Sequence, residues 1–114
     1  MSFLIIINDP PYGTERLYNG LRLAHTLIKK EHDVTVFLMA DAVSGAKAGQ
    51  KTPDGYYNVE RMLKLVINKG SVLLCGTCMD ARGLGDEDVI SGAKRSTMDK
   101  LADLTISSDK VLIF

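Results

Sequence analysis

Short apolar runs alternate along this chain with segments of helical pattern, and this alternation constrains the fold more than any other feature. The runs cover residues 3–7, 34–39, 71–74 and 110–114. Runs this rich in β-branched and aliphatic residues are typical of strands buried on both faces of a sheet. The order strand, helix, strand, helix, strand, helix, strand predicts right-handed crossovers and a parallel sheet covered by helices on both faces. A length of 114 residues suits one domain.

The segments between the runs carry signals for helix ends. Thr14 is the expected N-cap of the first helix and Asn58 that of the second. Ser96 and Asp99 resemble a capping box at the start of the last helix. Residues 41–57, which contain three glycines and a proline, predict one short helix followed by a long loop. A connection this long in a small domain is usually functional or interfacial.

The chain has two cysteines, Cys75 and Cys78, which follow directly after the third apolar run. Ligands of open parallel sheets bind beyond the carboxyl ends of the strands, so the thiols are expected at the ligand-binding edge. A helical turn over residues 77–81 would aim backbone amides at the Cys75 sulfur and lower its pKa from about 8.5 to about 3.5–7.5. Arg82 would add a positive charge, opposed by Asp80. We therefore predict Cys75 as the nucleophile, with Cys78 as a resolving thiol, a second carrier or a bystander.

The loop after the first apolar run is expected at the same edge. It contains the sequence Pro10-Pro11-Tyr12-Gly13-Thr14. We interpret it as a plain turn, as an anion-binding loop or as a wall of the thiol pocket, with Tyr12, Gly13 and Thr14 as candidate binding residues beside Arg82. The chain has neither a GxGxxG nor a GxxxxGK motif, so nucleotide binding is not indicated.

Charge and composition exclude several classes of protein. The 14 basic residues balance the 14 acidic ones, which removes the basic surface that nucleic acid requires. No apolar run approaches the roughly 18 residues of a membrane span, and the first residues lack the basic leader of a signal peptide. A cytoplasmic protein without nucleic-acid or membrane partners is expected. Besides the cysteines only His25 and His32 offer soft ligands, so neither a zinc site nor another cofactor is predicted.

Four blocks of the sequence resemble the DsrE/DsrF-like family, and most closely its YchN-like branch. The blocks are DPPYGTE at 9–15, FLMADAV at 37–43, CGTCMDARG at 75–83 and SDKVLIF at 108–114, in the family's order. The resemblance covers essentially the whole chain. It implies a three-layer, Rossmann-like α/β domain over residues 1–114 that assembles into homo-oligomers, either trimers or hexamers.

The resemblance also implies a role in sulfur relay. In the relay members a cysteine after the third strand carries a persulfide and passes the sulfur to a partner protein, and Cys75 matches that cysteine. Arg82 and Gly83 match the arginine–glycine pair of the same loop, and Cys78 matches YchN-like members.

Three functions remain open on these residues. The first is a sulfur carrier that uses Cys75, needs no cofactor and has sulfur donor and acceptor proteins as partners. The second is a non-catalytic oligomeric module that binds a small ligand or a partner. The third is dithiol–disulfide exchange between Cys75 and Cys78. A pKa clearly below 8.5 for one of the two thiols would favour thiol chemistry, and a pKa of about 8.5 or above for both would favour the binding module.

Overall fold

The structure, a computed structural model, describes all 114 residues and contains one parallel sheet of five strands. The strands are β1 (Ser2–Ile7), β2 (Asp33–Leu38), β3 (Ser71–Cys75), β4 (Ala93–Ser96) and β5 (Lys110–Ile113). They lie in the order β4-β3-β2-β1-β5, and every neighbouring pair is parallel. The central strands β1, β2 and β3 coincide with three apolar runs of the sequence, and most of their residues are buried.

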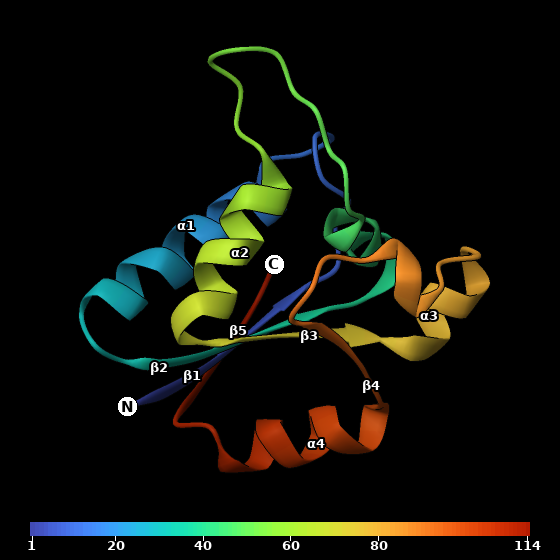
Figure 1. Ribbon diagram of the computed structural model, residues 1–114. Coiled ribbons are helices and arrows are strands. Elements are labelled where there is room, and N and C mark those ends of the chain that lie inside the picture. Colours follow the sequence, from blue (N-terminus) through green and yellow to red (C-terminus); the bar gives the residue numbers. More distant parts are fainter.

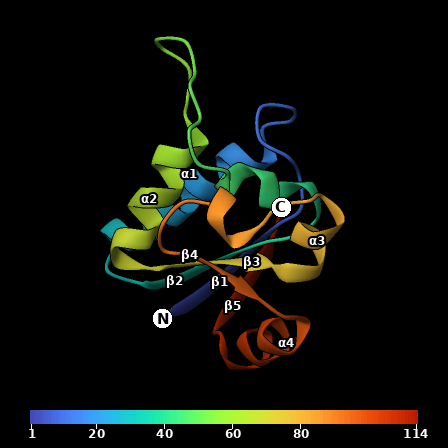
Figure 2. The same cartoon turned by 45° about the vertical axis from the view of Figure 1, so that its right-hand side comes forward.

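Helices cover both faces of this sheet (Figure 1). The helices α1 (Arg16–Lys29) and α2 (Val59–Lys69) pack on one face, and α4 (Met98–Ser107) packs on the other. Figure 2 shows the same three layers from a second direction. The short helix α3 (Gly76–Ala81) and the 3-10 turns η1 (Ala40–Ala46) and η2 (Asp86–Asp88) complete the chain. This arrangement confirms the predicted three-layer α/β fold. No helix has the length and apolar character needed to cross a membrane.

The second helix begins and ends where the sequence predicts. The Asn58 side chain accepts a hydrogen bond from the Arg61 amide at 3.1 Å, which satisfies one free donor of the first turn. Gly70 ends the helix and lies against β2, where a Cβ at this position would be 2.6 Å from the carbonyl oxygen of Val34. Glycine is therefore required for α2 to turn directly into β3.

We expect Gly70→Ala to lower the free energy of unfolding by about 2 kcal/mol, since the new methyl group must displace backbone rather than a flexible side chain. Chemical denaturation of the two proteins measures the difference. Gly13→Ala is the matched control, because a Cβ there has 3.8 Å to its nearest neighbour, Pro10 Cγ. A Gly70→Ala variant as stable as Gly13→Ala would contradict the assigned close approach.

Two of the predicted helix caps are wrong. Thr14 does not cap α1, which begins two residues later, and its hydroxyl instead donates to Asp9 Oδ2 at 2.6 Å. Ser96 does not cap α4, because Thr97 fills that position and accepts from the Lys100 amide at 3.2 Å. Ser96 is instead the last residue of β4, a strand that the sequence pattern does not predict.

The strand β4 was missed because it lacks an apolar run. Its sequence, Ala93-Lys94-Arg95-Ser96, has one buried hydrophobic residue and two exposed charged ones. As an edge strand it pairs with β3 alone, in the register Val72↔Ala93 to Cys75↔Ser96. Edge strands tolerate charge because one side of the strand meets solvent. The consequence for function is that β4 ends beside Cys75.

The long loop predicted after the second strand is present, and it projects beyond α2 as the green segment of Figure 1. Gln50 fixes its base. The side-chain amide of Gln50 donates to the carbonyl oxygens of Gly45 and Lys47 at 2.7 and 2.9 Å, and its backbone amide donates to Glu60 Oε1 at 2.8 Å. That last bond, with the neighbouring Lys64, lowers the pKa of Glu60. The loop is thus tied to the start of α2.

Candidate functional site

The two thiols lie where β3 passes into α3 without an intervening loop. Cys75 is the last residue of β3 and also the N-cap of α3, and Cys78 is in the first turn of that helix. Gly76 permits this direct passage, because a Cβ there would lie 3.0 Å from Arg95 Cγ and 3.2 Å from the Ser96 carbonyl oxygen. The local sequence therefore holds the thiols against the end of β4.

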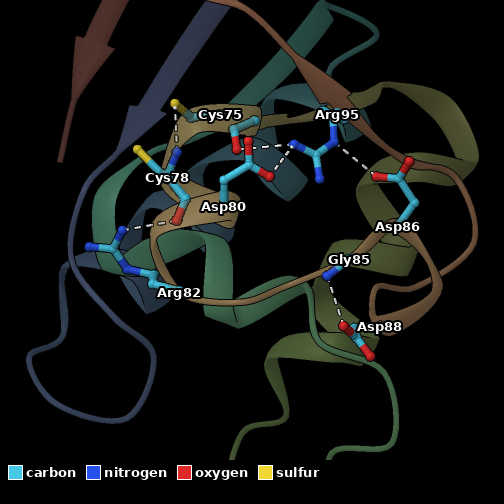
Figure 3. Close-up of polar contacts among 9 residues, drawn as sticks. Cys75, Cys78, Asp80, Arg82, Gly85, Asp86, Asp88 and Arg95 are labelled. Carbon is cyan, nitrogen blue, oxygen red and sulfur yellow. Dashed lines mark hydrogen bonds and ion pairs between the residues drawn. The ribbon is translucent and has the colours of Figure 1, made fainter.

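Backbone amides contact both sulfur atoms. Cys75 Sγ accepts the amide of Cys78 at 3.4 Å, as the N-cap of a helix does (Figure 3). Cys78 Sγ accepts the amide of Ala40 at 3.2 Å, from the turn that follows β2. The ends of β2 and β3 thus meet at the cysteines, as expected for the carboxyl edge of a parallel sheet. Cys75 is nearly buried, with 8% of its surface exposed, whereas Cys78 is half-buried.

The prediction that Cys75 has a lowered pKa is wrong. Burial raises the pKa of the Cys75 thiol, and the neighbouring Cys78 thiol raises it further. The amides of Cys78 and Thr77 act in the opposite direction without outweighing burial. The physical reason is that Cys75 belongs to the hydrophobic core, where the charged form loses its hydration, and that α3 has only six residues to supply a dipole.

Arg82 does not supply the positive charge predicted for Cys75. Its guanidinium donates to Asp41 Oδ1 at 2.7 and 2.9 Å and to the carbonyl oxygen of Cys78 at 3.0 Å. Figure 3 shows Arg82 on the far side of α3 from Arg95. The role of Arg82 in this structure is to tie the last turn of α3 to η1. Asp80, which was expected to oppose Arg82, pairs with Arg95 instead.

Arg95 is the residue of this site that sequence reasoning missed. Its Nη1 atom donates to the Gly76 carbonyl oxygen at 3.1 Å and to Asp80 Oδ1 at 2.9 Å, and its Nε donates to Asp86 Oδ1 at 3.0 Å (Figure 3). It therefore fastens both turns of α3 to β4. No local sequence signal marks Arg95, because its position depends on recognising the unpredicted strand.

A cleft of about 590 Å³ lies beside the thiols. The end of β3 and α3 contribute Cys75, Thr77 and Cys78, and the end of β4 and the start of α4 contribute Arg95, Ser96 and Met98. Arg95 is paired with two carboxylates, so the cleft holds no unpaired guanidinium. Nowhere in the chain are three or more His, Cys, Asp or Glu side chains grouped so that they could hold a metal ion.

The structure does not bring Tyr12, Gly13 and Thr14 into this cleft. The Tyr12 hydroxyl donates to Gln50 Oε1 at 2.5 Å and accepts the Val59 amide at 3.1 Å, while its ring stacks on Tyr57 with centroids 5.2 Å apart. The strand order explains the separation, because β2 lies between β1 and β3. In this structure Tyr12 links the long loop to the start of α2.

The raised pKa of Cys75 predicts a specific pH dependence. We expect alkylation of Cys75 by iodoacetamide to be slow at pH 7 and to rise with a midpoint above about 8.5, the value of an ordinary thiol. Mass spectrometry of a Cys78→Ser variant, which retains one thiol, measures the rate. The folded protein holds this proton to higher pH than the unfolded chain. The stabilisation that the protonated Cys75 thiol gives to the folded state is therefore complete below about pH 8.5, and it is lost as the pH rises through the pKa of the folded protein. A midpoint below 8.5 would contradict the burial argument.

Known proteins are similar to this chain over its whole length. The model of the DsrE/DsrF-like family matches residues 1–114. Protein YchN of Escherichia coli (strain K12) is 43% identical over 116 aligned positions, which cover 99% of this chain and 98% of that protein. The Sulfurtransferase TusD of Salmonella paratyphi B is 27% identical over 128 aligned positions, which cover all of both chains.

The fold has a close match among solved structures as well. The crystal structure of the ychN protein from E. coli superposes with a TM-score of 0.95 at 42% sequence identity, covering 100% of this chain and 99% of that one. The resemblance seen in the four sequence blocks is thereby confirmed, and the chain belongs to the DsrE/DsrF-like family.

Proposed function

We propose that this protein is a cytoplasmic sulfur carrier in which Cys75 accepts sulfane sulfur as a persulfide and passes it to an acceptor protein. The observation that carries the proposal is the position of Cys75, which caps α3 at the wall of a cleft with its sulfur facing the Cys78 amide. Membership of the DsrE/DsrF-like family and the similarity to a sulfurtransferase support it. The proposed reaction needs no cofactor.

The transfer conserves atoms and electrons. The Cys75 thiolate attacks the outer sulfur of a persulfide on the donor, the sulfur–sulfur bond of the donor breaks, and the donor leaves as a thiolate that takes up a proton. A new sulfur–sulfur bond forms on Cys75, so there is no net oxidation. Delivery to the acceptor repeats the step with the roles exchanged. Such exchange proceeds through the thiolate and depends on access to it.

Burial of Cys75 slows the first step but suits the loaded state. The raised pKa leaves little thiolate at neutral pH. In the persulfide, the outer sulfur is bonded to Cys75 Sγ at a distance of about 2.05 Å. The reactive atom therefore lies nearer to the cleft than Sγ does. An acceptor can then reach the sulfur without entering the protein. The cleft has no unpaired guanidinium, which favours a persulfide donor over a small dianion such as thiosulfate.

Homo-oligomers, trimers or hexamers, are part of the proposal. Three large apolar side chains, Met98, Ile106 and Ile113, are exposed on or beside the layer that α4 forms. Association would remove them from water, and Met98 lines the thiol cleft. Light scattering coupled to size-exclusion chromatography measures the mass of the assembly, and a monomer at micromolar concentration would contradict this part.

One observation favours a second candidate, a non-catalytic oligomeric module that binds a small ligand or a partner. The raised pKa of Cys75 is the direction expected of a thiol that serves packing rather than chemistry. In that case Cys75→Ala would retain the binding activity, and no sulfur would be gained from a persulfide donor.

The test is a loading experiment on the full chain. The reduced protein is incubated with glutathione persulfide, freed of donor by gel filtration, and mapped by peptide mass spectrometry. We expect a gain of one sulfur atom on the peptide that contains Cys75. No gain of sulfur by the Cys78→Ser variant, which keeps Cys75 as its one thiol, or a gain confined to Cys78 in wild type, would overturn the proposal.

A further inference from the structure

The position of Cys78 beside Cys75 points to a reaction between this thiol and a persulfide on Cys75. We propose that Cys78 discharges the Cys75 persulfide within the same chain, forming a Cys75–Cys78 disulfide and releasing hydrogen sulfide. The inference rests on the proposed function, since it begins from the persulfide on Cys75.

The two sulfur atoms are neighbours in one helical turn. Cys75 is the N-cap and Cys78 lies three residues later, so their side chains lie on the same face of α3. Cys75 Sγ is 3.4 Å from the Cys78 amide nitrogen, and both sulfurs point to the same side of the turn in Figure 3. Cys78 therefore lies beside the inner sulfur of a Cys75 persulfide, whereas the outer sulfur extends into the cleft.

The turn after β2 places a hydrogen-bond donor, the backbone amide of Ala40, next to Cys78. The Ala40 amide lies 3.2 Å from Cys78 Sγ, and Ala40 has a φ of 50°, in the left-handed region that alanine rarely adopts. Residues held in such conformations cluster at functional sites. This contact holds the Cys78 sulfur in the turn beside Cys75, from where its thiolate can attack a sulfur–sulfur bond.

The step balances without an external oxidant. The Cys78 thiolate attacks the inner sulfur, Cys75 Sγ. The bond between the inner and outer sulfur breaks, and its electron pair leaves with the outer sulfur as HS⁻, which takes up a proton. The sulfane sulfur is reduced to sulfide while the two cysteine sulfurs are oxidised to the disulfide. An acceptor protein must therefore take the sulfur before Cys78 does, because a chain that has been discharged to the disulfide needs a thiol reductant before it can be loaded again.

The experiment compares loaded wild type with loaded Cys78→Ser. Both are charged with glutathione persulfide, freed of donor, and held without reductant while sulfide is measured colorimetrically and protein mass is followed. Wild type should release about one sulfide per loaded chain and gain the disulfide, whereas Cys78→Ser should keep its extra sulfur at least ~10-fold longer, because no second thiolate is available. Cys78→Ala should match Cys78→Ser.

The outcomes separate the two proposals. If both proteins load and wild type retains its sulfur as long as Cys78→Ser does, the discharge step is overturned and the sulfur carrier stands. If wild type gains the disulfide without releasing sulfide, direct oxidation explains the bond and the discharge step is again overturned. If neither protein gains sulfur, the carrier itself fails and the discharge step fails with it.

Discussion

Cys75→Ser should abolish sulfur loading while the protein remains folded. A serine hydroxyl offers no thiolate at neutral pH, so the attacking group is removed. The fold should tolerate the change because position 75 is the N-cap of α3, where serine is among the preferred residues, and its oxygen can accept the Cys78 amide in place of Sγ. We expect essentially complete loss of the persulfide adduct with unfolding free energy changed by no more than about 1 kcal/mol.

Intact-protein mass spectrometry after exposure to glutathione persulfide measures this loss, with circular dichroism and denaturation as checks on folding. Cys78→Ser is the matched control, since it removes the other thiol of the same turn and should still gain one sulfur atom. A Cys75→Ser protein that loads as much sulfur as Cys78→Ser would exclude Cys75 as the carrier and leave Cys78 as the remaining thiol.

Phe37→Ala should produce the largest loss of stability. Phe37 is 1% exposed in β2, which lies between β1 and β3. It pairs in register with Ile6, and the next residue, Ile7, lies against Gly20 of α1, so the alternation of side chains puts Phe37 on the α4 face. Removing a fully buried ring leaves a cavity that the strands on either side cannot fill. We expect the unfolding free energy to fall by about 3–5 kcal/mol, a large share of the roughly 5–15 kcal/mol typical of a native domain.

Chemical denaturation followed by circular dichroism measures the Phe37 effect. Ile106→Ala is the control from the same layer, because Ile106 lies on α4 with 84% of its surface exposed and should change the unfolding free energy by no more than about 0.5 kcal/mol. Equal effects of the two substitutions would mean that the α4 face of the sheet is not a packed core.

The central part of the fold could be predicted because it depends on burial. The strands β1, β2 and β3 are buried on both faces, so nearly every position must be apolar and the pattern is visible in the sequence. The N-cap Asn58 and the terminating Gly70 are equally local signals. The strand β4 has no such pattern, because it lies at the edge of the sheet, where two of its four residues can be charged and exposed. Without β4, the sequence pattern puts the N-cap of α4 at Ser96 rather than at Thr97.

The candidate site could also be predicted only in part. Placing Cys75 and Cys78 at the carboxyl edge follows from topology alone, and the contact between Ala40 and Cys78 agrees with it. The charged partners were not predictable, because they depend on which strands are neighbours. Arg82 is close to Cys75 in sequence, but its guanidinium pairs with Asp41. Arg95 lies 20 positions after Cys75, and it contacts α3 from the neighbouring strand β4. Burial, which reversed the expected pKa of Cys75, is likewise a property of the assembled core.

The composition of β4 also affects how copies of this protein can meet. Exposed outer strands are templates for unlimited addition of further strands, and short length together with lysine or arginine side chains opposes such growth. β4 has four residues, two of them cationic, and β5 at the opposite margin has four residues and begins with Lys110. Continuous cross-β stacking is therefore disfavoured at both margins, and the proposed homo-oligomer would form through the helical and apolar surfaces instead.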